Sequence, residues 1–478
     1  MTHLRTLITA AIWVVLATPA QAQHNLTVEP YRFETRDGRE VDAELGRFEV
    51  PENRATASGR TVELAFVRFP STNPNPGSPI VYLAGGPGGS GIGAAGGSRF
   101  DLFMAMREIA DVIAFDQRGT GLSEQPPDCP YRWTYPPEQP ATREALLAVA
   151  LENARECAAF WREEGVDLAA YNTNENADDL EALRKTLGAD RLNLWSISYG
   201  THLALATIRR HPESIERVIL AGVEGLDHTV KMPSDQQRLL EHIADLANAS
   251  EDVNHAVPDL LDTMETVLSR LEKEPATVVL GDTVRVGVSK FDVQRITAQM
   301  LHSPGWSGTI PAFYHGMLQG NFARAAAYTL DMNRSGGLYA MSAGMDAASG
   351  ISDARLRKYK RERRETLLSD AINFPYPELI ETLGVPDLGE AFRAPVESDV
   401  PVLMISGTMD GRTPVSNAED VRPGLSNSAH LIIKGAGHSD PLFLSSPRIL
   451  EVMHAFFRGE GVRDEVISLP PIAFTPIE

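Results

Sequence analysis

The chain has 478 residues, of which 43% are hydrophobic, and it carries a formal net charge of −20. This length allows one large domain with an insertion, or two domains, and the composition is that of an ordinary soluble globular protein. The negative charge argues against nucleic acid and anionic membrane surfaces as partners, because both repel an acidic protein.

The first 22 residues have the pattern of an export signal. Arg5 supplies a positive charge, residues 7–16 form an apolar run too short to span a bilayer, and residues 20–22 (AQA) form a small-x-small cleavage site. We therefore expect a mature chain that begins at Gln23, is periplasmic or secreted, and has no membrane attachment after cleavage. An uncleaved membrane anchor is the alternative.

The first half of the chain alternates predicted strands with predicted helices. After β-hairpins in residues 24–70, short buried strands are expected at 80–84, 112–115, 192–197 and 217–223, and helices at 101–109, 143–164, 178–187 and 199–210. Such alternation is typical of a doubly wound, mostly parallel sheet in the α/β class.

The alternation stops after Gly225 and returns near the C-terminus. Residues 226–395 contain mainly amphipathic helical stretches, whereas strands at 400–405 and 429–433 and a helix at 448–458 resume the earlier pattern. We expect one core formed by residues 23–225 and 396–478, into which residues 226–395 are inserted as a mainly helical cap.

Cys129 and Cys157 are the two cysteines of the chain. Because an exported protein meets an oxidising compartment, we expect them to form a disulfide, with two free buried thiols as the alternative.

Ser198 lies at the corner between a predicted strand and a predicted helix. Residues 196–200 (SISYG) are a degenerate form of the G-x-S-x-G turn, in which a tight corner projects a nucleophilic serine above a sheet. Serine replaces the first glycine but is still small. Ser196 is a poor rival nucleophile, because Leu194 stands where its own turn would need a small residue. An ordinary serine at a strand end is the alternative interpretation.

A nucleophilic serine needs a base, and the base needs an acid that orients it. Asp410 and His438 follow Ser198 in the order Ser, acid, His, and each comes just after a predicted strand, where the functional side chains of parallel sheets collect. We predict that Ser198 is the nucleophile, His438 the base and Asp410 the acid, with Glu224 as the rival acid. We expect no metal ion and no cofactor.

The Gly-rich stretch 85–91 is expected to form part of an oxyanion hole. One donor would be the backbone N–H of Tyr199, and the other that of Gly88, with Gly86 as second choice. The same stretch fits the G-x-G-x-x-G pattern of dinucleotide-binding proteins. Pro87 between the first two glycines and a weak start to the following helix argue against that alternative.

Several stretches resemble the proline iminopeptidase and tripeptidyl aminopeptidase family of α/β-hydrolases. They are residues 85–91 (GGPGGSG), 116–123 (DQRGTGLS) and 198–201 (SYGT), with Asp410 and His438. The resemblance runs from about residue 80 to residue 457. It implies an α/β-hydrolase fold with a helical cap over the site, the triad named above, and release of residues from the amino end of short peptides. Ala84 stands where many iminopeptidases have His, which favours the exported tripeptidyl-type branch.

An aminopeptidase must bind a substrate ammonium, and a desolvated carboxylate near the cleft would do so. Glu224, at the end of a predicted strand, is the candidate, and a capping or salt-bridged acid is the alternative interpretation. Within residues 116–123 we expect Arg118 to pair with Asp116 and brace the Gly-rich loop.

These observations predict an exported serine hydrolase that acts on short peptides, or on another small acyl substrate, through a covalent acyl-enzyme. Two alternatives stay open. One is a carboxylesterase or lactonase on the same scaffold, since a fold does not fix the substrate, and the other is a non-catalytic ligand-binding protein.

Overall fold

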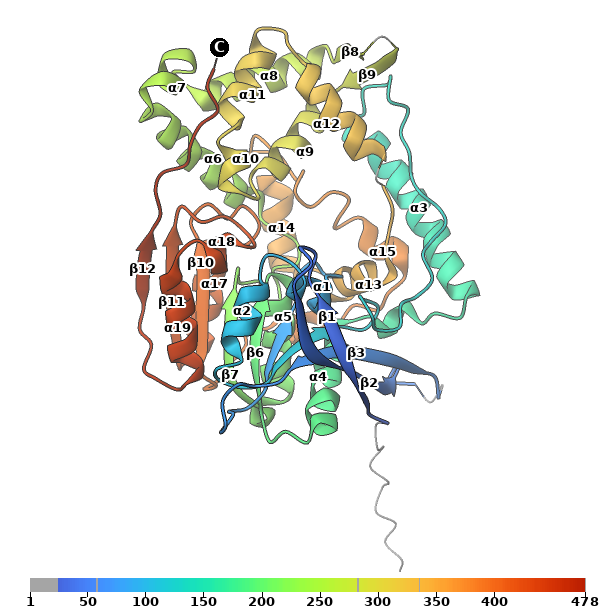
Figure 1. Cartoon of the computed structure of the whole chain (residues 1–478). Coiled ribbons are helices and arrows are strands. Elements are labelled where there is room, and N and C mark those ends of the chain that lie inside the picture. Colours follow the sequence, from blue (N-terminus) through green and yellow to red (C-terminus); the bar gives the residue numbers. More distant parts are fainter. Residues whose placement is uncertain (1–24, 57–58, 282, 335, 478) are drawn as a thin grey trace, which may run out of the picture.

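The computed structural model describes residues 25–56, 59–281, 283–334 and 336–477. The predicted export signal lies outside these residues. A 10-stranded sheet forms the lower half of the molecule, and the helices of the cap lie above it (Figure 1).

The sheet has the order β1-β2-β3-β5-β4-β6-β7-β10-β11-β12. Its strands are β1 (Thr27–Glu34), β2 (Glu40–Pro51), β3 (Thr61–Phe69), β4 (Ile80–Leu83), β5 (Val112–Asp116), β6 (Leu192–Ile197), β7 (Ile215–Ala221), β10 (Val402–Gly407), β11 (Ser428–Lys434) and β12 (Glu465–Ser468). The pairs from β1 through β3 to β5 are antiparallel, and all pairs from β5 to β12 are parallel. The sheet is therefore mostly parallel, as the alternation of elements predicts.

Helices cover both faces of the sheet. α2 (Phe100–Met106) and α19 (Pro447–Phe457) pack on one face, whereas α4 (Thr173–Leu187) and α5 (Tyr199–Arg210) pack on the other. Strand β6 serves both cores, because successive side chains point to opposite faces. Leu194 packs with α4 and α5, and the next residue, Trp195, packs with α2.

The cap contains eleven helices and one hairpin in its described residues. The helices are α6 (Pro233–Asn248), α7 (Glu251–Ala256), α8 (Leu260–Lys273), α9 (Lys290–Met300), α10 (Pro304–Ser307), α11 (Ile310–Leu318), α12 (Ala323–Arg334), α13 (Ala340–Ser349), α14 (Asp353–Glu362), α15 (Leu379–Leu383) and α16 (Gly389–Arg393). The antiparallel hairpin of β8 (Ala276–Leu280) and β9 (Val284–Val288) is one element that the helical pattern of the cap did not predict.

One helix from the first half of the chain also belongs spatially to the cap. α3 (Arg143–Glu163) runs beside the cap helices and packs against α15 (Figure 1). Nη2 of Arg143 lies 2.6 Å from Oδ2 of Asp370 and 2.7 Å from Oε1 of Glu378. The cap is therefore tied to a segment that precedes Ser198 in the chain.

The remaining elements are short. They are α1 (Gly91–Ala95), α17 (Val415–Val421), α18 (Pro441–Leu444) and 3-10 turns at Leu168–Ala170, Pro212–Ser214 and Arg422–Gly424. In the part of the chain that the structure describes, none of the helices combines the length and apolarity needed to traverse a bilayer.

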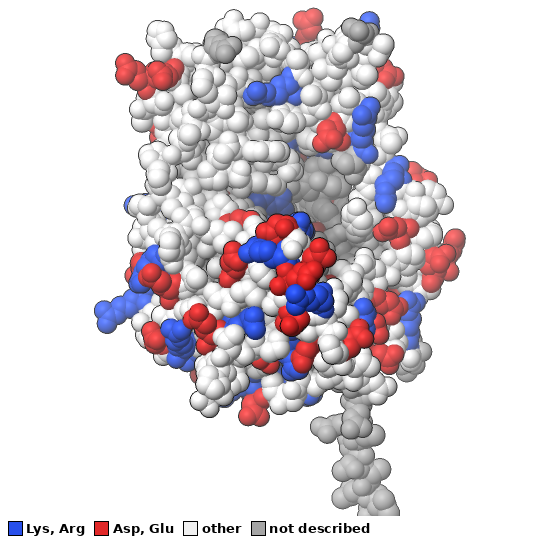
Figure 2. Space-filling view, in the orientation of Figure 1, with Lys and Arg blue, Asp and Glu red and all other residues white. Residues whose placement is uncertain are grey.

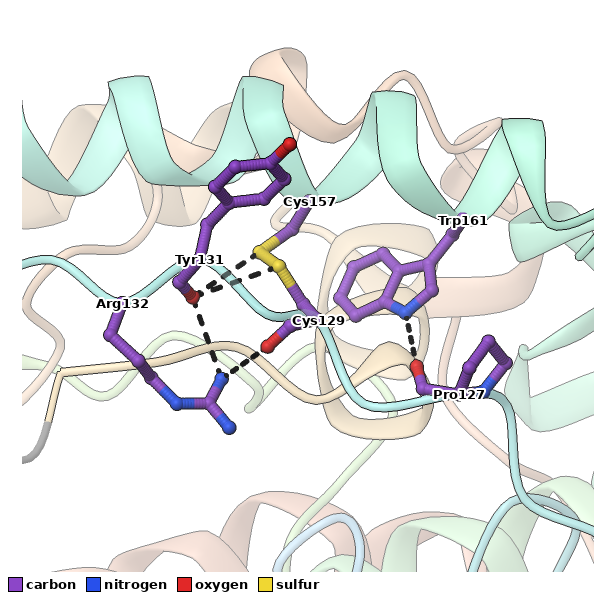
Figure 3. Close-up of a disulfide and its surroundings, with 6 residues drawn as sticks. All are labelled: Pro127, Cys129, Tyr131, Arg132, Cys157 and Trp161. Atoms are coloured by element: carbon purple, nitrogen blue, oxygen red, sulfur yellow. Dashed lines mark hydrogen bonds between the residues drawn. A yellow bond between two sulfur atoms is a disulfide. The ribbon is translucent and has the colours of Figure 1, made fainter.

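A disulfide joins Cys129 to Cys157, the pair that the cysteine count predicts (Figure 3). It fastens the Pro-rich segment 124–140 to α3. A second link lies beside it, where Nε1 of Trp161 donates a hydrogen bond to the carbonyl oxygen of Pro127 at 2.9 Å. The segment is thus held on the helix at two points.

Replacing Cys157 with Ser is expected to lower the free energy of unfolding by about 3–4 kcal/mol, because the bridge closes a loop of 28 residues in the unfolded chain. Urea denaturation followed by circular dichroism measures this change. Wild-type protein treated with a reductant should lose a similar amount. A loss below about 1 kcal/mol in both samples would show that the packing of the segment, and not the cross-link, stabilises it.

Candidate active site

Ser198 occupies a strained turn between β6 and α5. Its backbone dihedrals are φ 54° and ψ −127°, a conformation that residues other than glycine rarely adopt. Three hydrogen bonds hold the turn. The N–H and the hydroxyl of Thr201 each donate to the carbonyl of Ser198 at 2.7 Å, and the N–H of Ser198 donates to the carbonyl of Ala221 at 2.9 Å. Strain of this kind is what projects a nucleophile above a sheet.

The residues two before and two after Ser198 explain how the turn tolerates its degenerate sequence. A side chain at Gly200 is impossible, because its Cβ would lie 2.2 Å from the carbonyl oxygen of Leu83. At the other position Ser196 fits, because its fully buried hydroxyl donates to the carbonyl of Ile219 at 2.6 Å. Ser196 is therefore directed into the sheet and cannot act as the nucleophile.

Asp410 and His438 meet on the loops that follow β10 and β11. Nδ1 of His438 lies 2.8 Å from Oδ2 of Asp410. The backbone N–H groups of Arg412 and Thr413 each donate to Oδ1 of Asp410 at 2.8 Å, and the hydroxyl of Thr413 donates to Oδ2 at 2.8 Å. Burial acts to raise the pKa of Asp410, but His438 and the Thr413 hydrogen bonds outweigh it and leave the pKa below its ordinary value. The carboxylate therefore stays ionised and can orient the imidazole.

Ser198 and His438 line the same cavity, which has a volume of about 550 Å³. In the described structure, no hydrogen bond joins the hydroxyl of Ser198 to the ring of His438. Such bonds are often long in free enzymes and shorten when substrate binds. The structure thus brings the three predicted triad residues to one edge of the sheet. Figure 2 shows the surface hollowed between the cap and the core, with many acidic and basic side chains along the lower edge of the hollow.

The Gly-rich loop after β4 approaches Ser198 at Gly85. Gly85 and Gly86 line the cavity, and a Cβ at Gly85 would lie 2.8 Å from Cβ of Ser198. Gly88 is not among the lining residues. A Cβ there would instead lie 3.7 Å from Cβ of Ser342 in the cap. Gly86, the second choice from the sequence, thus lines the cavity with Ser198, whereas Gly88, the first choice, does not.

The other predicted oxyanion donor, the N–H of Tyr199, is the first of α5. Amide groups in the first turn of a helix lack a partner within the helix, so this N–H can bind a developing negative charge. The phenol of Tyr199 is turned away and fully buried, and its hydroxyl donates to Sδ of Met345 in α13 at 3.1 Å. Tyr199 therefore offers its backbone, and not its side chain, to the cavity.

The expected pairing of Arg118 with Asp116 is wrong. Arg118 forms two hydrogen bonds with Asp179 of α4, Nε–Oδ2 at 2.7 Å and Nη2–Oδ1 at 2.8 Å. Asp116 itself braces the Gly-rich loop, since it accepts hydrogen bonds from the hydroxyl of Ser90 at 2.6 Å and from the N–H of Ile92 at 3.0 Å. Because these bonds occupy Asp116, its carboxylate is not free to bind a ribose. The dinucleotide-binding alternative therefore lacks the acidic residue that it requires at this position.

Glu224, predicted to bind a substrate ammonium, is buried in an internal ion pair. Its Oε2 lies 2.7 Å from Nζ of Lys231, and Glu224 is only 4% exposed. It is not among the residues that line the cavity with Ser198. The structure thus places Glu224 as the salt-bridged acid that formed the alternative interpretation.

A second carboxylate, which sequence reasoning missed, lies near Glu224. Asp346 is on α13, a half-buried helix position one residue after Met345, and no ion pair or side-chain hydrogen bond is formed by it in the described structure. Burial, reinforced by repulsion from Glu224, raises the pKa of Asp346 to about 7. Only the three-dimensional approach of α13 to the strand ends reveals it, because nothing in its own sequence context distinguishes it.

His302, between α9 and α10, connects the cap to His438. Its carbonyl oxygen accepts a hydrogen bond from the N–H of His438 at 3.1 Å. Burial, together with Arg412 and His438, lowers the pKa of His302 to about 3, so its ring is neutral at neutral pH. The neutral ring lies with Nε2 3.2 Å from Nη1 of Arg412. Among the described residues, no three His, Cys, Asp or Glu side chains gather in a way that could hold a metal ion.

A family model described as alpha/beta hydrolase fold matches residues 78–443. Over 183 residues the chain is 32% identical to a serine protease Hip1 of Mycobacterium bovis, which covers 37% of this chain and 35% of that protein. Over 192 residues it is 29% identical to a tripeptidyl aminopeptidase of Streptomyces coelicolor, which covers 38% of this chain and 35% of that protein. The chain thus spans about a third of the length of these two relatives.

A longer match is found with a putative hydrolase YuaR of Escherichia coli, 24% identical over 431 residues, which cover 84% of this chain and 82% of that protein. Among solved structures, a proline iminopeptidase of Mycobacterium smegmatis aligns with 86% of this chain and 97% of its own, at 15% identity and a TM-score of 0.40. At this identity and TM-score, the structural similarity carries no information about the activity of this chain.

Proposed function

The chain belongs to the α/β-hydrolase fold family, and we propose that it is an exported serine peptidase that releases amino acids or short peptides from the amino end of its substrates. The observation that carries the proposal is the Asp410–His438 pair beside the strained Ser198, in a cavity that Gly85 and Gly86 also line. Two relatives of this chain are named a serine protease and a tripeptidyl aminopeptidase. These names support a peptide as the substrate class.

The chemistry follows from the positions of these groups. His438 takes the proton of the Ser198 hydroxyl as Oγ attacks the scissile carbonyl, and the N–H groups of Gly86 and Tyr199 bind the oxyanion. His438 then gives its proton to the leaving amine, which departs and leaves an acyl-enzyme. Water repeats the cycle, with His438 again as base, and restores Ser198. Asp410 holds the tautomer of His438 that can accept the proton, through the 2.8 Å bond to Nδ1.

Two features support export. Residues 1–22 have the three parts of a signal peptide, and the disulfide between Cys129 and Cys157 is a bond that persists in oxidising compartments.

The amine of the substrate needs an anionic partner, and Asp346 is better suited to this role than Glu224. Neither carboxylate is among the residues that line the cavity with Ser198, but Lys231 already neutralises Glu224, whereas Asp346 has no ion pair in the described structure. Its helix, α13, contacts both the Gly-rich loop and the residue after the nucleophile. A substrate ammonium bound here would relieve the repulsion between the two carboxylates.

We expect Asp346→Asn to lower kcat/KM about 10- to 100-fold for peptides with a free amino end, and little for N-acetylated esters. In the wild type, kcat/KM for free peptides should rise with pH through about 7 as Asp346 ionises, and fall above about 8 as the substrate amine loses its proton. Initial rates from pH 5.5 to 9 measure both. Asp353→Asn, the same change at an exposed position of α14, should leave the profile intact. An equal loss on both substrate types would reject the role.

Labelling with a serine-directed phosphonate, followed by assays on aminoacyl and peptidyl anilides with free or acetylated amino ends, tests the proposed function. We expect a covalent adduct on Ser198 and a strong preference for free amino ends. Labelling with turnover of esters alone would indicate the carboxylesterase alternative. Absence of labelling and of turnover would indicate a ligand-binding protein.

A further inference from the structure

The cavity that contains Ser198 is rich in arginine although the chain is acidic overall. Its charged lining residues, apart from histidines, are Arg36, Arg99, Arg412 and Asp440. The lining thus has three cations and one anion, in a chain whose net charge is −20. A cavity of opposite sign to the rest of the protein attracts and retains anionic groups.

Arg99 is fully engaged by the protein. Its Nε donates to Asp440 at 2.9 Å, its Nη2 donates to the hydroxyl of Ser439 at 2.9 Å, and its Nη1 donates to the hydroxyl of Tyr82. This residue links the Gly-rich side of the cavity to the loop that follows His438. Its charge is compensated by Asp440, so it has a structural role.

Arg412 differs from Arg99 in having most of its donors open. Its Nη1 is paired with the neutral ring of His302 at 3.2 Å, and in the described structure its guanidinium has no other hydrogen bond and no ion pair. The positive charge of Arg412 acts to lower the pKa of Asp346, but no ion pair joins the two side chains in the described structure. A guanidinium has five N–H donors that match a carboxylate in a fork geometry. Arg412 is therefore a partly buried cation that lines the cavity and lacks an anionic partner.

The position of Arg412 indicates which part of a substrate it would meet. It lies two residues after Asp410, and through His302 it is connected to the backbone of His438. In the proposed mechanism His438 gives its proton to the leaving amine, so the leaving group must lie on the His438 side of the cavity. Asp346, in contrast, is carried by the cap helix that contacts Gly88 and Tyr199 on the oxyanion side.

We propose that Arg412 binds the terminal carboxylate of the leaving group, so that the enzyme prefers short peptides whose free carboxyl end lies within one or two residues of the bond that is cut. This inference rests on the proposed function and adds its substrate class. The exposed Arg36, whose Nη2 is 3.4 Å from the carbonyl of Gly93, lies on the cavity lining as a second, outer cation that attracts the same group.

The experiment compares free peptides with the same peptides amidated at the carboxyl end, at three to five residues in length, using the full chain and product analysis by mass spectrometry. For the wild type we expect kcat/KM to be about 10- to 100-fold higher for the acid than for the amide when the leaving group is one residue. The ratio should fall toward one as the leaving group lengthens, and it should shrink at high salt.

Arg412→Gln should bring the acid-to-amide ratio close to one, and Arg412→Lys should keep part of it, because lysine retains the charge but not the fork. Arg155→Gln, the same change at an exposed position of α3, should keep the wild-type ratio. A ratio near one in a wild type that labels at Ser198 would overturn this inference while leaving the proposed function intact. An unchanged acid-to-amide ratio in Arg412→Gln would also overturn it. So would a wild-type preference for substrates with an acidic side chain in the amino-terminal residue, whatever the state of the carboxyl end. Failure to label Ser198 would count against the proposed function itself.

Discussion

Replacing Ser198 with Ala is expected to lower kcat/KM for every cleaved substrate by about 10⁴- to 10⁶-fold, because no covalent acyl-enzyme can then form. The remaining rate would come from the oxyanion donors and from substrate binding, which do not depend on the hydroxyl. Rates with a chromogenic peptide, together with intact-mass measurement after phosphonate treatment, test this. The wild type should gain the mass of one phosphonyl group, and the variant none.

Ser196→Ala is the matched control, since it removes a hydroxyl two residues away in the same turn. That hydroxyl binds the carbonyl of Ile219 and is fully buried, so we expect an adduct and turnover within about threefold of the wild type. Loss of one buried hydrogen bond should lower the free energy of unfolding by about 1 kcal/mol. Turnover that survives in Ser198→Ala, or an adduct found on Ser196, would contradict the assignment of the nucleophile.

The second large effect is expected for Asp410→Asn, which should lower kcat by about 10⁴-fold. The amide cannot stabilise the imidazolium and favours the wrong tautomer of His438, although the shape of the site is kept. Because the pKa of Asp410 lies below its ordinary value of 3.8, its contribution is present at neutral pH and is lost only as the pH falls into the acid range. Activity lost between pH 8 and pH 5 must therefore come from another group.

Thr413→Val is a milder change at the same carboxylate and should lower the activity less than Asp410→Asn. It removes the hydroxyl that donates to Oδ2 of Asp410 but keeps the backbone N–H that donates to Oδ1. We expect a loss of about 10-fold, far smaller than for Asp410→Asn, with thermal unfolding measured on both variants to exclude misfolding. Activity in Asp410→Asn above a tenth of the wild-type level would show that this carboxylate does not orient the base.

Much of the fold followed from local patterns in the sequence. The apolar run 192–197 and the adjoining helical period 199–210 predict a strand followed by a helix, and both are present at those bounds. Parallel strands end at one edge of a sheet, so residues just after such strands, Asp410 and His438 among them, had to gather near Ser198. That reasoning needs only the order of elements and not their packing.

Other features depended on which distant segments came into contact. The acidic partner of Arg118 is Asp179, which is 61 positions away, and not the nearby Asp116. Even the pair of Glu224 with Lys231, which are close in the sequence, forms only because the chain turns back after β7. His302 lines the cavity and Asp346 lies near Glu224 because segments of the cap approach the strand ends, and their own sequence contexts carry no motif.

The sequence by itself determined the order of strands and helices, the corner that carries Ser198 and the set of residues at the strand ends, because these depend on backbone conformations set by near neighbours. Only the tertiary structure decided which glycine of the 85–91 loop lies against Ser198, which acids are already paired, and that Arg412 keeps most of its donors open among the described residues. Those outcomes depend on contacts such as Arg118 with Asp179, 61 positions apart, and Arg412 with His302, 110 positions apart, and local preferences hold no information about such encounters.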